Sequence, residues 1–516
     1  MTTTPNQQIE AAWTYHDGTK HSYRSVRSNR HVLDFANQPL PFKIYTTLDP
    51  IPLPKDAPPV TLPALEAVAA PPSSPARDAV PDLPALAALL YLSGGITRVR
   101  QGKGWEIQYR AASCTGALYH IDLYLVCGDL PGLPAGLYHF GVHDFALRRL
   151  RAGHYRGLLA RATGEEPAVV TAPAVIVCTS TFWRNAWKYQ ARAYRHCFWD
   201  AGTILANLLA AAAGQGMPAR VVLGFADAPV NALLGLDTER EVSLALLPLG
   251  RVSGPVPGGA PEVTPLSSET APLSRFEADY PAIRAMHAAS SLEPGTETSS
   301  WRGAGPPGDP VAGSGESVAL TPIPGGALPR DSVTDVIVRR GSTRQFARTA
   351  LGLPQLSTVL ERATRGIPAD FLEPPGATLN TLYVIAHAVD DLSPGSYVYH
   401  RGAQRLELLR QGSFRDEAGY LGLEQELPAD ASVNVYCLSD LTAVLARFGN
   451  RGYRAAQLEG GIIGGKLYLA AYALRLGATG LTYYDDEVTK FFSPHAADKS
   501  VMFLTAVGHP ARRRAG

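Results

Sequence analysis

Arginines and a hydroxyl alternate in a short segment of the C-terminal part of the chain. Arg340, Ser342 and Arg344 are each separated by one residue, so an extended or turning backbone can direct all three side chains the same way. Two guanidinium groups and a hydroxyl on one side can bind a phosphate through charge-assisted hydrogen bonds. A basic run is also typical of a solvated surface, so the segment alone leaves both interpretations open.

A second segment, in the N-terminal half, is small, polar and glycine-containing. Ser113, Cys114, Thr115 and Gly116 precede an apolar, strand-like run. Because glycine has no Cβ, such a segment lets backbone N–H groups approach a planar ligand closely. An ordinary polar turn has a similar composition. The segment is therefore a candidate ligand-contacting loop.

Lys188 and Tyr189 form a pair of neighbouring titratable groups. Burial can lower the pKa of a lysine, and a nearby ammonium can lower the pKa of a phenol, which would suit such a pair to proton transfer. The alternative is a lysine that starts a helix in a salt bridge, with the tyrosine packed behind it.

These segments lie in two parts of the chain that repeat each other. Gly136–Phe140 and Gly395–Tyr399 have similar sequences at an offset of 259 (395 − 136). A constant offset as long as a domain indicates a duplicated domain rather than a solenoid. The same offset relates Tyr124 to Tyr383, Tyr194 and Arg195 to Tyr453 and Arg454, Asp200 to Glu459, Gly202 to Gly461, and Asp227 to Asp486.

The two copies keep different candidate residues. At offset 259, Lys188 and Tyr189 correspond to Arg447 and Phe448, which cannot exchange protons in the same way. The arginine segment has no counterpart in the first copy, where an offset of 270 places Ala-Pro-Pro-Ser-Ser at residues 70–74. The small polar loop corresponds to Leu-Glu-Pro-Pro at 372–375. A fused dimer that has kept one of two equivalent sites would show this complementary pattern.

The chain of 516 residues is too long for one core, and we expect four segments. They are a Pro-rich N-terminal extension (1–82), a first domain (83–253), a Pro/Gly/Ser-rich linker (254–329) and a second domain (330–516). Within the linker, only Arg275–Ser290 has helix-compatible periodicity. Each domain is expected to order its elements as helix, strand, strand, helix, strand.

The central helix of the second copy contains Gly460, Gly461, Gly464 and Gly465. Each glycine costs a helix interior roughly 1 kcal/mol relative to alanine. Four of them predict either very close packing against a large neighbour, such as the partner helix, or a broken helix. Close packing is the interpretation that suits a pseudo-dimer.

Composition limits the class of protein. The formal net charge of +1 gives no global field for nucleic acid or an anionic membrane. The five cysteines are odd in number and form no CxxC pair, which is typical of reduced thiols. The first residues have no apolar leader, and the apolar stretch Thr203–Ala213 is shorter than the roughly 20 residues that span a bilayer. We expect a cytoplasmic protein with neither nucleic-acid nor membrane partners.

The motifs resemble those of a known family. Arg340–Phe346 resembles the N-terminal phosphate-binding motif of FMN-dependent nitroreductases. Ser113–Tyr119 is similar to the flavin-contacting segment of SagB-type (azoline) dehydrogenases, usually Pro-Ser-Ala-Gly-Ala-Leu-Tyr-Pro, although Ser113 and Cys114 stand at Pro-Ser and His120 replaces the last proline. Further similarity lies in Gly136–Phe140, in Lys188 with Tyr189, and in Val222–Phe225; it covers Leu83–Gly250 well and Val333–Arg514 more weakly.

The resemblance implies an α+β fold in which two fused nitroreductase-like domains form an intramolecular pseudo-dimer with FMN at the interface. It implies that Lys188 and Tyr189 perform the proton chemistry. The implied FMN contacts are Arg340, Ser342, Arg344 and Arg513 at the phosphate, Ser113, Cys114, Thr115 and Gly116 at the ring, and the backbone of Tyr483 at the ring edge. Further self-association of the pseudo-dimer remains open.

Three functions follow as alternatives. The first is dehydrogenation, in which flavin N5 takes a hydride from a carbon of an azoline-type substrate, either a small molecule or a peptide. The second is a reductase that uses NAD(P)H to reduce a nitro compound, quinone or enone. The third is a flavin-less scaffold that binds a partner. The region before Leu83 does not resemble the peptide-recognition domain found in many family members, so the substrate is less constrained than the cofactor.

Overall fold

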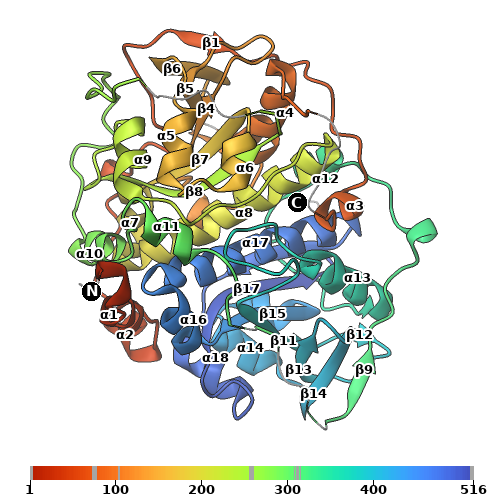
Figure 1. Ribbon diagram of the computed structural model, residues 1–516. Coiled ribbons are helices and arrows are strands. Elements are labelled where there is room, and N and C mark those ends of the chain that lie inside the picture. Colours follow the sequence, from red (N-terminus) through yellow and green to blue (C-terminus); the bar gives the residue numbers. More distant parts are fainter. Residues whose placement is uncertain are drawn as a thin grey trace.

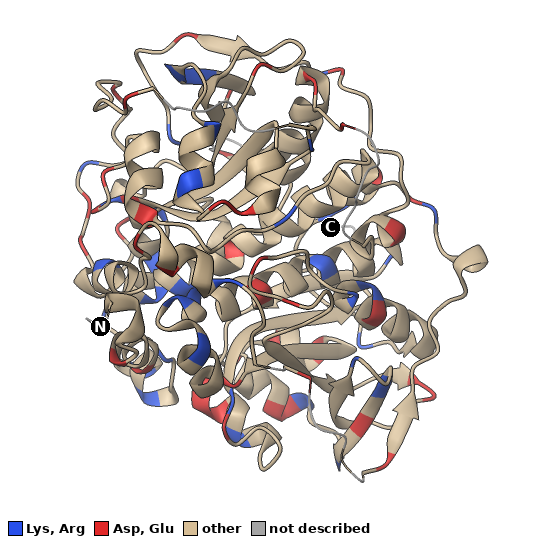
Figure 2. Cartoon of the chain, in the orientation of Figure 1, with Lys and Arg blue, Asp and Glu red and all other residues tan. Residues whose placement is uncertain are grey.

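The computed structural model describes residues 4–71, 78–102, 105–254, 261–306, 308–309, 313 and 315–511. Figure 1 shows two β-sheets, one above and one below a central pair of long helices, α8 (Ala193–Gly214) and α17 (Arg451–Ala473). Within the described chain, acidic and basic residues are interspersed over both halves in the view of Figure 2. The molecule is thus two similar halves that meet at a helical layer.

The two sheets have matching strand orders. In the first half the order is β1 (Pro50–Pro52), β6 (Ala146–Ala152), β5 (Gly136–Gly141), β4 (Ile121–Cys127), β7 (Ala174–Thr181), β8 (Glu241–Leu249). In the second it is β9 (Ser317–Ala319), β14 (Arg405–Gln411), β13 (Gly395–His400), β11 (Asn380–Ala386), β15 (Val433–Ser439), β17 (Ser500–Gly508), β16 (Gly477–Leu481). Neighbouring strands in both sheets are antiparallel, and β16 corresponds to residues 219–222 of the first half, which join β8 only through isolated bridges at Ala219 and Val222.

Strand register follows the repeat offset. Tyr124 pairs with His139 across β4 and β5, and Tyr383 pairs with Val398 across β11 and β13. Both members of the second pair lie 259 residues after those of the first. Because a one-residue slip would turn every side chain to the opposite face, the shared register means that both copies bury equivalent positions.

The helices also correspond one to one. The first half contains α3 (Ala64–Val68), α4 (Leu83–Gly94), α5 (Arg156–Ala162), α6 (Pro167–Thr171), α7 (Phe182–Tyr189), α8 and α9 (Asp227–Leu234). The second contains α12 (Val333–Arg339), α13 (Leu353–Thr364), α14 (Arg415–Leu421), α15 (Glu426–Asp430), α16 (Leu441–Phe448), α17 and α18 (Asp485–Phe492). The sheet pairs β2 (Ile96–Gly102) with β3 (Trp105–Arg110), and β10 (Leu351–Gly352) with β12 (Val389–Asp390), are small additions. The predicted α+β fold of two fused domains is confirmed.

Two helices before each domain make equivalent contacts. α1 (Glu10–Gly18) is followed by α2 (Tyr23–Ser28), and α10 (Pro281–Ala289) by α11 (Thr296–Trp301). Arg195 donates to the carbonyl of His16 and the hydroxyl of Thr19, at 2.6 and 3.1 Å. Arg454 donates in the same way to His287 and Ser290, at 2.7 and 2.8 Å. α10 lies inside the helix-compatible stretch, α11 was not expected, and the four predicted segment boundaries stay predictions.

Gly461 and Gly465 of α17 pack against α8, whereas Gly460 and Gly464 pack against Phe503 of β17. The helix is unbroken, so the alternative of a broken helix is wrong. A Cβ built on Gly461 would lie 2.6 Å from the carbonyl oxygen of Trp199, and one on Gly202 would lie 2.6 Å from Gly461 backbone. Gly465 lies equally close to Ala206. The backbones of the two helices therefore touch, as the close-packing interpretation predicts.

Replacing Gly461 with alanine is expected to destabilise the protein. Helix propensity alone would favour alanine by roughly 1 kcal/mol. The new methyl group meets backbone atoms that cannot rotate away, so we expect a net loss of about 1–3 kcal/mol, measured as a lower urea midpoint. Gly18→Ala is the control, because a Cβ there meets nothing within 4 Å. Equal or higher stability of Gly461→Ala would contradict the close contact.

Buried ion clusters join each long helix to the opposite half. Asp227, the first residue of α9, accepts from Arg451 and Arg454 of α17 at 2.6 and 2.7 Å. Asp485, the first residue of α18, accepts from Arg192 and Arg195 of the first half at 2.9 and 2.6 Å. All six side chains are buried. These clusters lock the two halves together.

The expected correspondence of Asp227 with Asp486 is wrong by one residue. Asp485 occupies the equivalent position, whereas Asp486 is exposed and pairs with Lys20. The offset is still 259 from Gly224 to Tyr483 and becomes 258 from the start of α9 to the start of α18, because the turn directly before the helix is one residue shorter in the second half. A constant offset therefore cannot assign residues beyond such a shift.

One helical stretch of the described chain, Phe182–Gly214, is long and apolar enough to cross a membrane by composition. It is longer than the expected Thr203–Ala213, because aromatic and charged residues at its beginning hide the helix in the sequence. Its most apolar window is 83% buried inside the protein. It is therefore a core helix, and the one that supplies most contacts to the candidate site.

Candidate active site between the two halves

Arg340 follows α12 and reaches across to the first half. Its Nε and Nη2 donate to the carbonyl oxygens of Ala111 and Arg110, at 2.8 and 3.1 Å. Arg98, on β2, meets the same turn, because a Cβ built on Gly341 would lie 3.2 Å from Arg98 Nη2. Burial and the charge of Arg98 lower the pKa of Arg340, while nearby tyrosines oppose them. No described carboxylate pairs with either guanidinium, so the two converging cations are suited to an external anion.

Ser342 and Arg344 follow Arg340 in the sequence and lie on the same side of the site as Arg98 and Arg340. Ser342 Oγ is 3.2 Å from the hydroxyl of Tyr468, and the Arg340 guanidinium lies 5.6 Å from the centre of the Tyr468 ring. Arg344 is exposed, and its charge acts on the phenol of Tyr189 in the other half. Arg513, the fourth predicted phosphate contact, lies outside the described residues. The structure thus gathers three of the four predicted contacts and adds Arg98.

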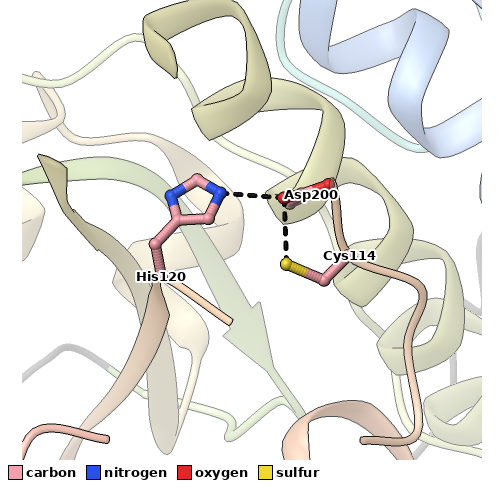
Figure 3. A group of neighbouring side chains, drawn as sticks. All are labelled: Cys114, His120 and Asp200. Atoms are coloured by element: carbon pink, nitrogen blue, oxygen red, sulfur yellow. Dashed lines mark hydrogen bonds and ion pairs between the residues drawn. The ribbon is translucent and has the colours of Figure 1, made fainter. Parts of the chain in front are cut away.

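The predicted loop Ser113–Gly116 is clamped to α8 by Asp200 (Figure 3). Thr115 donates from N and Oγ to Asp200 Oδ1 at 3.0 and 2.9 Å, and Cys114 Sγ donates to Oδ2 at 3.1 Å. The Ser113 carbonyl accepts from the hydroxyl of Thr203 at 2.7 Å. Gly116 is left exposed at the tip with a φ of 65°, a conformation that favours glycine.

The same cluster has ligand types that bind metals. Asp200 Oδ2 lies 2.8 Å from Nε2 of His120, and suitable atoms of Cys114, His120 and Asp200 lie within 4.8 Å of one another. Both oxygens of Asp200 are, however, already occupied by protein donors, and burial raises the pKa of the Cys114 thiol. The cluster is therefore a hydrogen-bonded clamp.

The second half contains an equivalent clamp without cysteine or histidine. Glu459, at the position corresponding to Asp200, accepts from Leu379 N at 2.8 Å, from Asn380 Nδ2 at 2.7 Å and from the hydroxyl of Thr378. Both carboxylates hold the loop that enters the central strand of their sheet. This shared task supports a structural role for Asp200, which the individual motifs did not reveal.

Lys188 and Tyr189 meet the loop from the end of α7. Lys188 Nζ is exposed and lies 5.3 Å from the centre of the Tyr189 ring. A Cβ on Gly116 would lie 2.8 Å from the Tyr189 hydroxyl, so this phenol rests on the glycine. Burial raises the pKa of Tyr189 above its ordinary value, Asp200 adds to the effect and Arg344 opposes it. The expected lowering of a phenol pKa by the lysine does not occur, and the hydroxyl is suited to donate a hydrogen bond.

Tyr483 is fully buried, and its ring centre lies 5.9 Å from that of Trp199. Among the described residues, no acceptor is found for the backbone N–H of Thr482 or Tyr483. At offset 259 these correspond to Leu223 and Gly224, whose N–H groups donate to the carboxylate of Asp370 at 2.9 and 2.8 Å. The two N–H groups are thus bonded to the Asp370 side chain at Leu223 and Gly224, whereas at Thr482 and Tyr483 they are available to a ligand.

Residues 301–304 cover the rest of the position in the second half that corresponds to the candidate site. Trp301 Nε1 donates to the carbonyl of Phe448 at 2.8 Å, with the ring centres 5.0 Å apart. Arg447 donates to the carbonyls of Arg302 and Ala304, at 2.7 and 3.0 Å. Burial raises the pKa of Asp370, which lies beneath this cover, to about 6. Phe448, which corresponds to Tyr189, is therefore buried under this segment, and the exposed Arg447, which corresponds to Lys188, is bonded to it.

Cavities add little to this assignment. Ser113, Cys114, Arg110 and Asp200 line a small cavity of about 10 Å³. An open pocket of about 480 Å³ lies elsewhere, between Pro54–Pro59, α4 and the turn after β5, and none of the predicted site residues lines it. The convergence of charges and loops, rather than a deep cavity, defines the candidate site.

Comparisons with known proteins show which proteins the chain and its fold resemble. Residues 137–251 match the model of the nitroreductase family. A structure of a protein described as a nitroreductase from Anabaena variabilis is 27% identical, covers 97% of this chain and 99% of its own, and superposes with a TM-score of 0.77. A nitroreductase of Methanocaldococcus jannaschii is 23% identical over 166 residues, which are 32% of this chain and 79% of that protein.

The fold and the family match define the class. The protein has a nitroreductase-like fold over both halves and carries a nitroreductase family domain in the first half, which supports an oxidoreductase. A structure of the Escherichia coli microcin synthetase complex with a truncated precursor peptide also matches, at 17% identity over 49% of this chain and 95% of its own. Its TM-score of 0.30 carries no argument about function.

Proposed function

We propose that this protein is an FMN-dependent dehydrogenase with one flavin site, formed by both halves of the chain. The observation that carries the proposal is the meeting of Arg98 and Arg340, from different halves, beside the loop Ser113–Gly116. Two cations with no described acidic partner suit a phosphate, and the loop offers a close approach for a planar ring. The nitroreductase-like fold supports a flavin cofactor.

The residues present fit FMN in three ways. Arg98, Arg340, Ser342 and Arg344 would hold the phosphate. The backbone N–H groups of Thr482 and Tyr483, for which the described residues offer no acceptor, would donate to the ring edge. Asp200 would keep Thr115 and Gly116 against the ring face.

When bound, FMN supplies a hydride acceptor for a substrate carbon. The chain supplies the substrate contacts. Tyr189 stays protonated because burial raises its pKa, so its hydroxyl would orient the substrate by donating a hydrogen bond. Lys188, at the exposed end of the pair, would in its neutral amine form take up the proton that leaves the atom next to that carbon and become an ammonium. The resemblance of Ser113–Tyr119 to azoline dehydrogenases suggests an azoline ring, in a peptide or a small molecule, as the substrate class.

Absorption of the purified protein tests the cofactor. Flavin bands near ~450 nm are expected, with one FMN released per chain on heating, because protein groups fill the second copy of the site. A colourless protein that takes up no FMN would overturn the proposal and leave the scaffold interpretation. Two FMN per chain would contradict the filled second site.

Anaerobic reduction tests the reaction. A thiazoline-containing peptide is expected to bleach the flavin, and Lys188→Ala and Tyr189→Phe should each slow bleaching by about 100-fold or more. Arg447→Ala is the matched control, because Arg447 occupies the position of Lys188 in the filled copy and should leave the rate unchanged. Rapid bleaching by NADPH with no response to azolines would favour a reductase instead.

A further inference from the structure

A stretch of the N-terminal segment, Asn29–Phe35, forms the rim of the candidate site. It is extended up to Asp34 and ends at Phe35, the first residue of a 3-10 helix (Phe35–Asn37), whose ring lies edge-on to that of Trp187 at 5.6 Å between centres. His31 Nε2 lies 2.8 Å from the carbonyl of Trp187, and Trp187 Nε1 donates to the carbonyl of Asp34 at 3.1 Å. Leu33 packs into a small apolar cluster with Leu118, Trp187 and Tyr189. This rim segment therefore lies directly beside the proposed substrate-orienting hydroxyl.

The rim segment directs alternate side chains outward. His31 and Leu33 face the protein, whereas Arg30 and Val32 face solvent, as an extended backbone requires. Val32 is 83% exposed and Phe35 is 71% exposed, both high values for large apolar side chains. Within the described chain, no acceptor is found for the N–H groups of Val32 and Leu33. Such an edge can pair with another extended strand.

The charge around the rim segment is mainly positive, although the segment contains the exposed Asp34, which lies 3.8 Å from Arg275. No Asp or Glu occurs between Asp17 and Asp34, while the stretch contains Lys20, Arg24, Arg27 and Arg30. Lys20 and Arg27 are paired with acidic residues elsewhere. In the described structure Arg24 and Arg30 make no ion pair, and Lys188 is exposed nearby. The outward face therefore combines apolar side chains with cations.

In the second half, the segment that corresponds to the rim segment is packed against the protein. At the offset of 271 that relates His16 to His287, the rim segment corresponds to residues 300–306, which cover the filled site. There Trp301 is 4% exposed and is tied to the end of α16, as the rim segment is tied to α7. Only the copy beside the available site presents its apolar side chains to solvent.

We propose that the rim segment docks an extended, acidic polypeptide segment with apolar side chains across the entrance of the site. Its carboxylates would face Arg24, Arg30 and Lys188, and its apolar side chains would cover Val32 and Phe35. Its backbone would pair with the solvent-facing edge of the rim segment, which presents the N–H of one of the two neighbours Val32 and Leu33. The inference rests on the proposed function for what lies behind the entrance. The docking contacts themselves need no cofactor.

Fluorescence anisotropy with a labelled peptide tests this docking. The probe is fluorescein-Glu-Leu-Glu-Val-Glu-Phe-Glu-Leu, and its counterpart carries lysine at every glutamate. We expect the full-length protein to bind the acidic peptide at least tenfold more tightly than the basic one. The double variant Arg30→Glu/Phe35→Ser should weaken acidic-peptide binding at least tenfold. Raising the salt concentration to about 0.5 M should also weaken it.

A matched variant controls for general surface effects. Arg149→Glu/Val80→Ser changes an exposed arginine and a 39% exposed valine on other elements and should bind as the parent does. Equal affinity for both peptides, or unchanged affinity in the rim variant, would overturn the inference. The flavin spectrum is recorded on the same samples. Peptide binding by a colourless protein would refute the proposed function while leaving the docking intact.

Discussion

Arg340→Ala is expected to yield protein that retains almost no flavin. Each charge-assisted hydrogen bond to the phosphate is worth about 1.5–3 kcal/mol, which corresponds to roughly 10- to 150-fold in affinity. Arg340 also carries two hydrogen bonds between the halves, so its removal loosens the loop that would face the ring. The measurement is the ratio of flavin to protein after desalting, followed by titration of FMN against the flavin-free form.

Two further variants separate binding from folding. Arg98 and Arg344 are exposed, so Arg98→Ala and Arg344→Ala should each weaken FMN about tenfold or more without changing the melting temperature of the flavin-free protein. Arg339→Ala is the neighbouring control, because Arg339 donates to Asp331 and to the carbonyl of Tyr472 instead. Full flavin content in an Arg340→Ala/Arg344→Ala double variant would exclude this phosphate site.

Asp227→Ala should be among the most destabilising single substitutions. It leaves Arg451 and Arg454, both fully buried, without their carboxylate, and breaking a buried pair in this way costs about 3–5 kcal/mol. The free energy of unfolding from urea titration gives the measurement. Asp237→Ala, at an exposed position ten residues later, should change it by less than about 0.5 kcal/mol.

The same cluster predicts acid sensitivity. Burial opposes ionisation of Asp227, but Arg451 and Arg454 outweigh it and lower its pKa from 3.8 to about 2. Since the folded pKa is the lower one, the stabilisation is complete above pH 4 and is lost as the pH falls from about 4 to 2. A shift of this size corresponds to about 2–3 kcal/mol. Asp227→Asn should lose correspondingly less stability than the parent between pH 5 and pH 2, and identical losses would contradict the pairing.

The fold was predictable because similar motifs at a constant offset are a signal that needs no contact information. Tyr124 and Tyr383 share an offset with Asp200 and Glu459, and the sheets share register at that offset. The N-terminal helices escaped this comparison, because their offset, as from His16 to His287, is 271. Insertions between these helices and the domains that follow them change the offset. The helices are short and have little sequence similarity, so the sequence gives no other indication that they correspond.

Parts of the candidate site were harder to predict from the sequence than the fold was. Arg98 lies on an exposed hairpin beside Arg100, and such alternating cations are indistinguishable in sequence from a solvated strand. The clamp of Cys114, His120 and Asp200 joins residues about 80 positions apart, and only the Asp200–Glu459 correspondence hinted at it. The filling of the second copy by Trp301 and Asp370 could not be foreseen, since loop residues gain these roles from tertiary contacts alone.

The hydrogen bonds between His21 and Asp485 give the turn between α1 and α2 a late partner during synthesis. His21 N donates to the Asp485 carboxylate at 2.8 Å, and the Asp485 N–H donates back to the His21 carbonyl at 3.0 Å, so this turn gains both contacts only after α18 has been made. Arg195 can hold the end of α1 much earlier, through His16 and Thr19. A ribosome-stalled chain ending before α18 should therefore leave the turn around His21 open to protease, whereas the chain that includes α18 protects it.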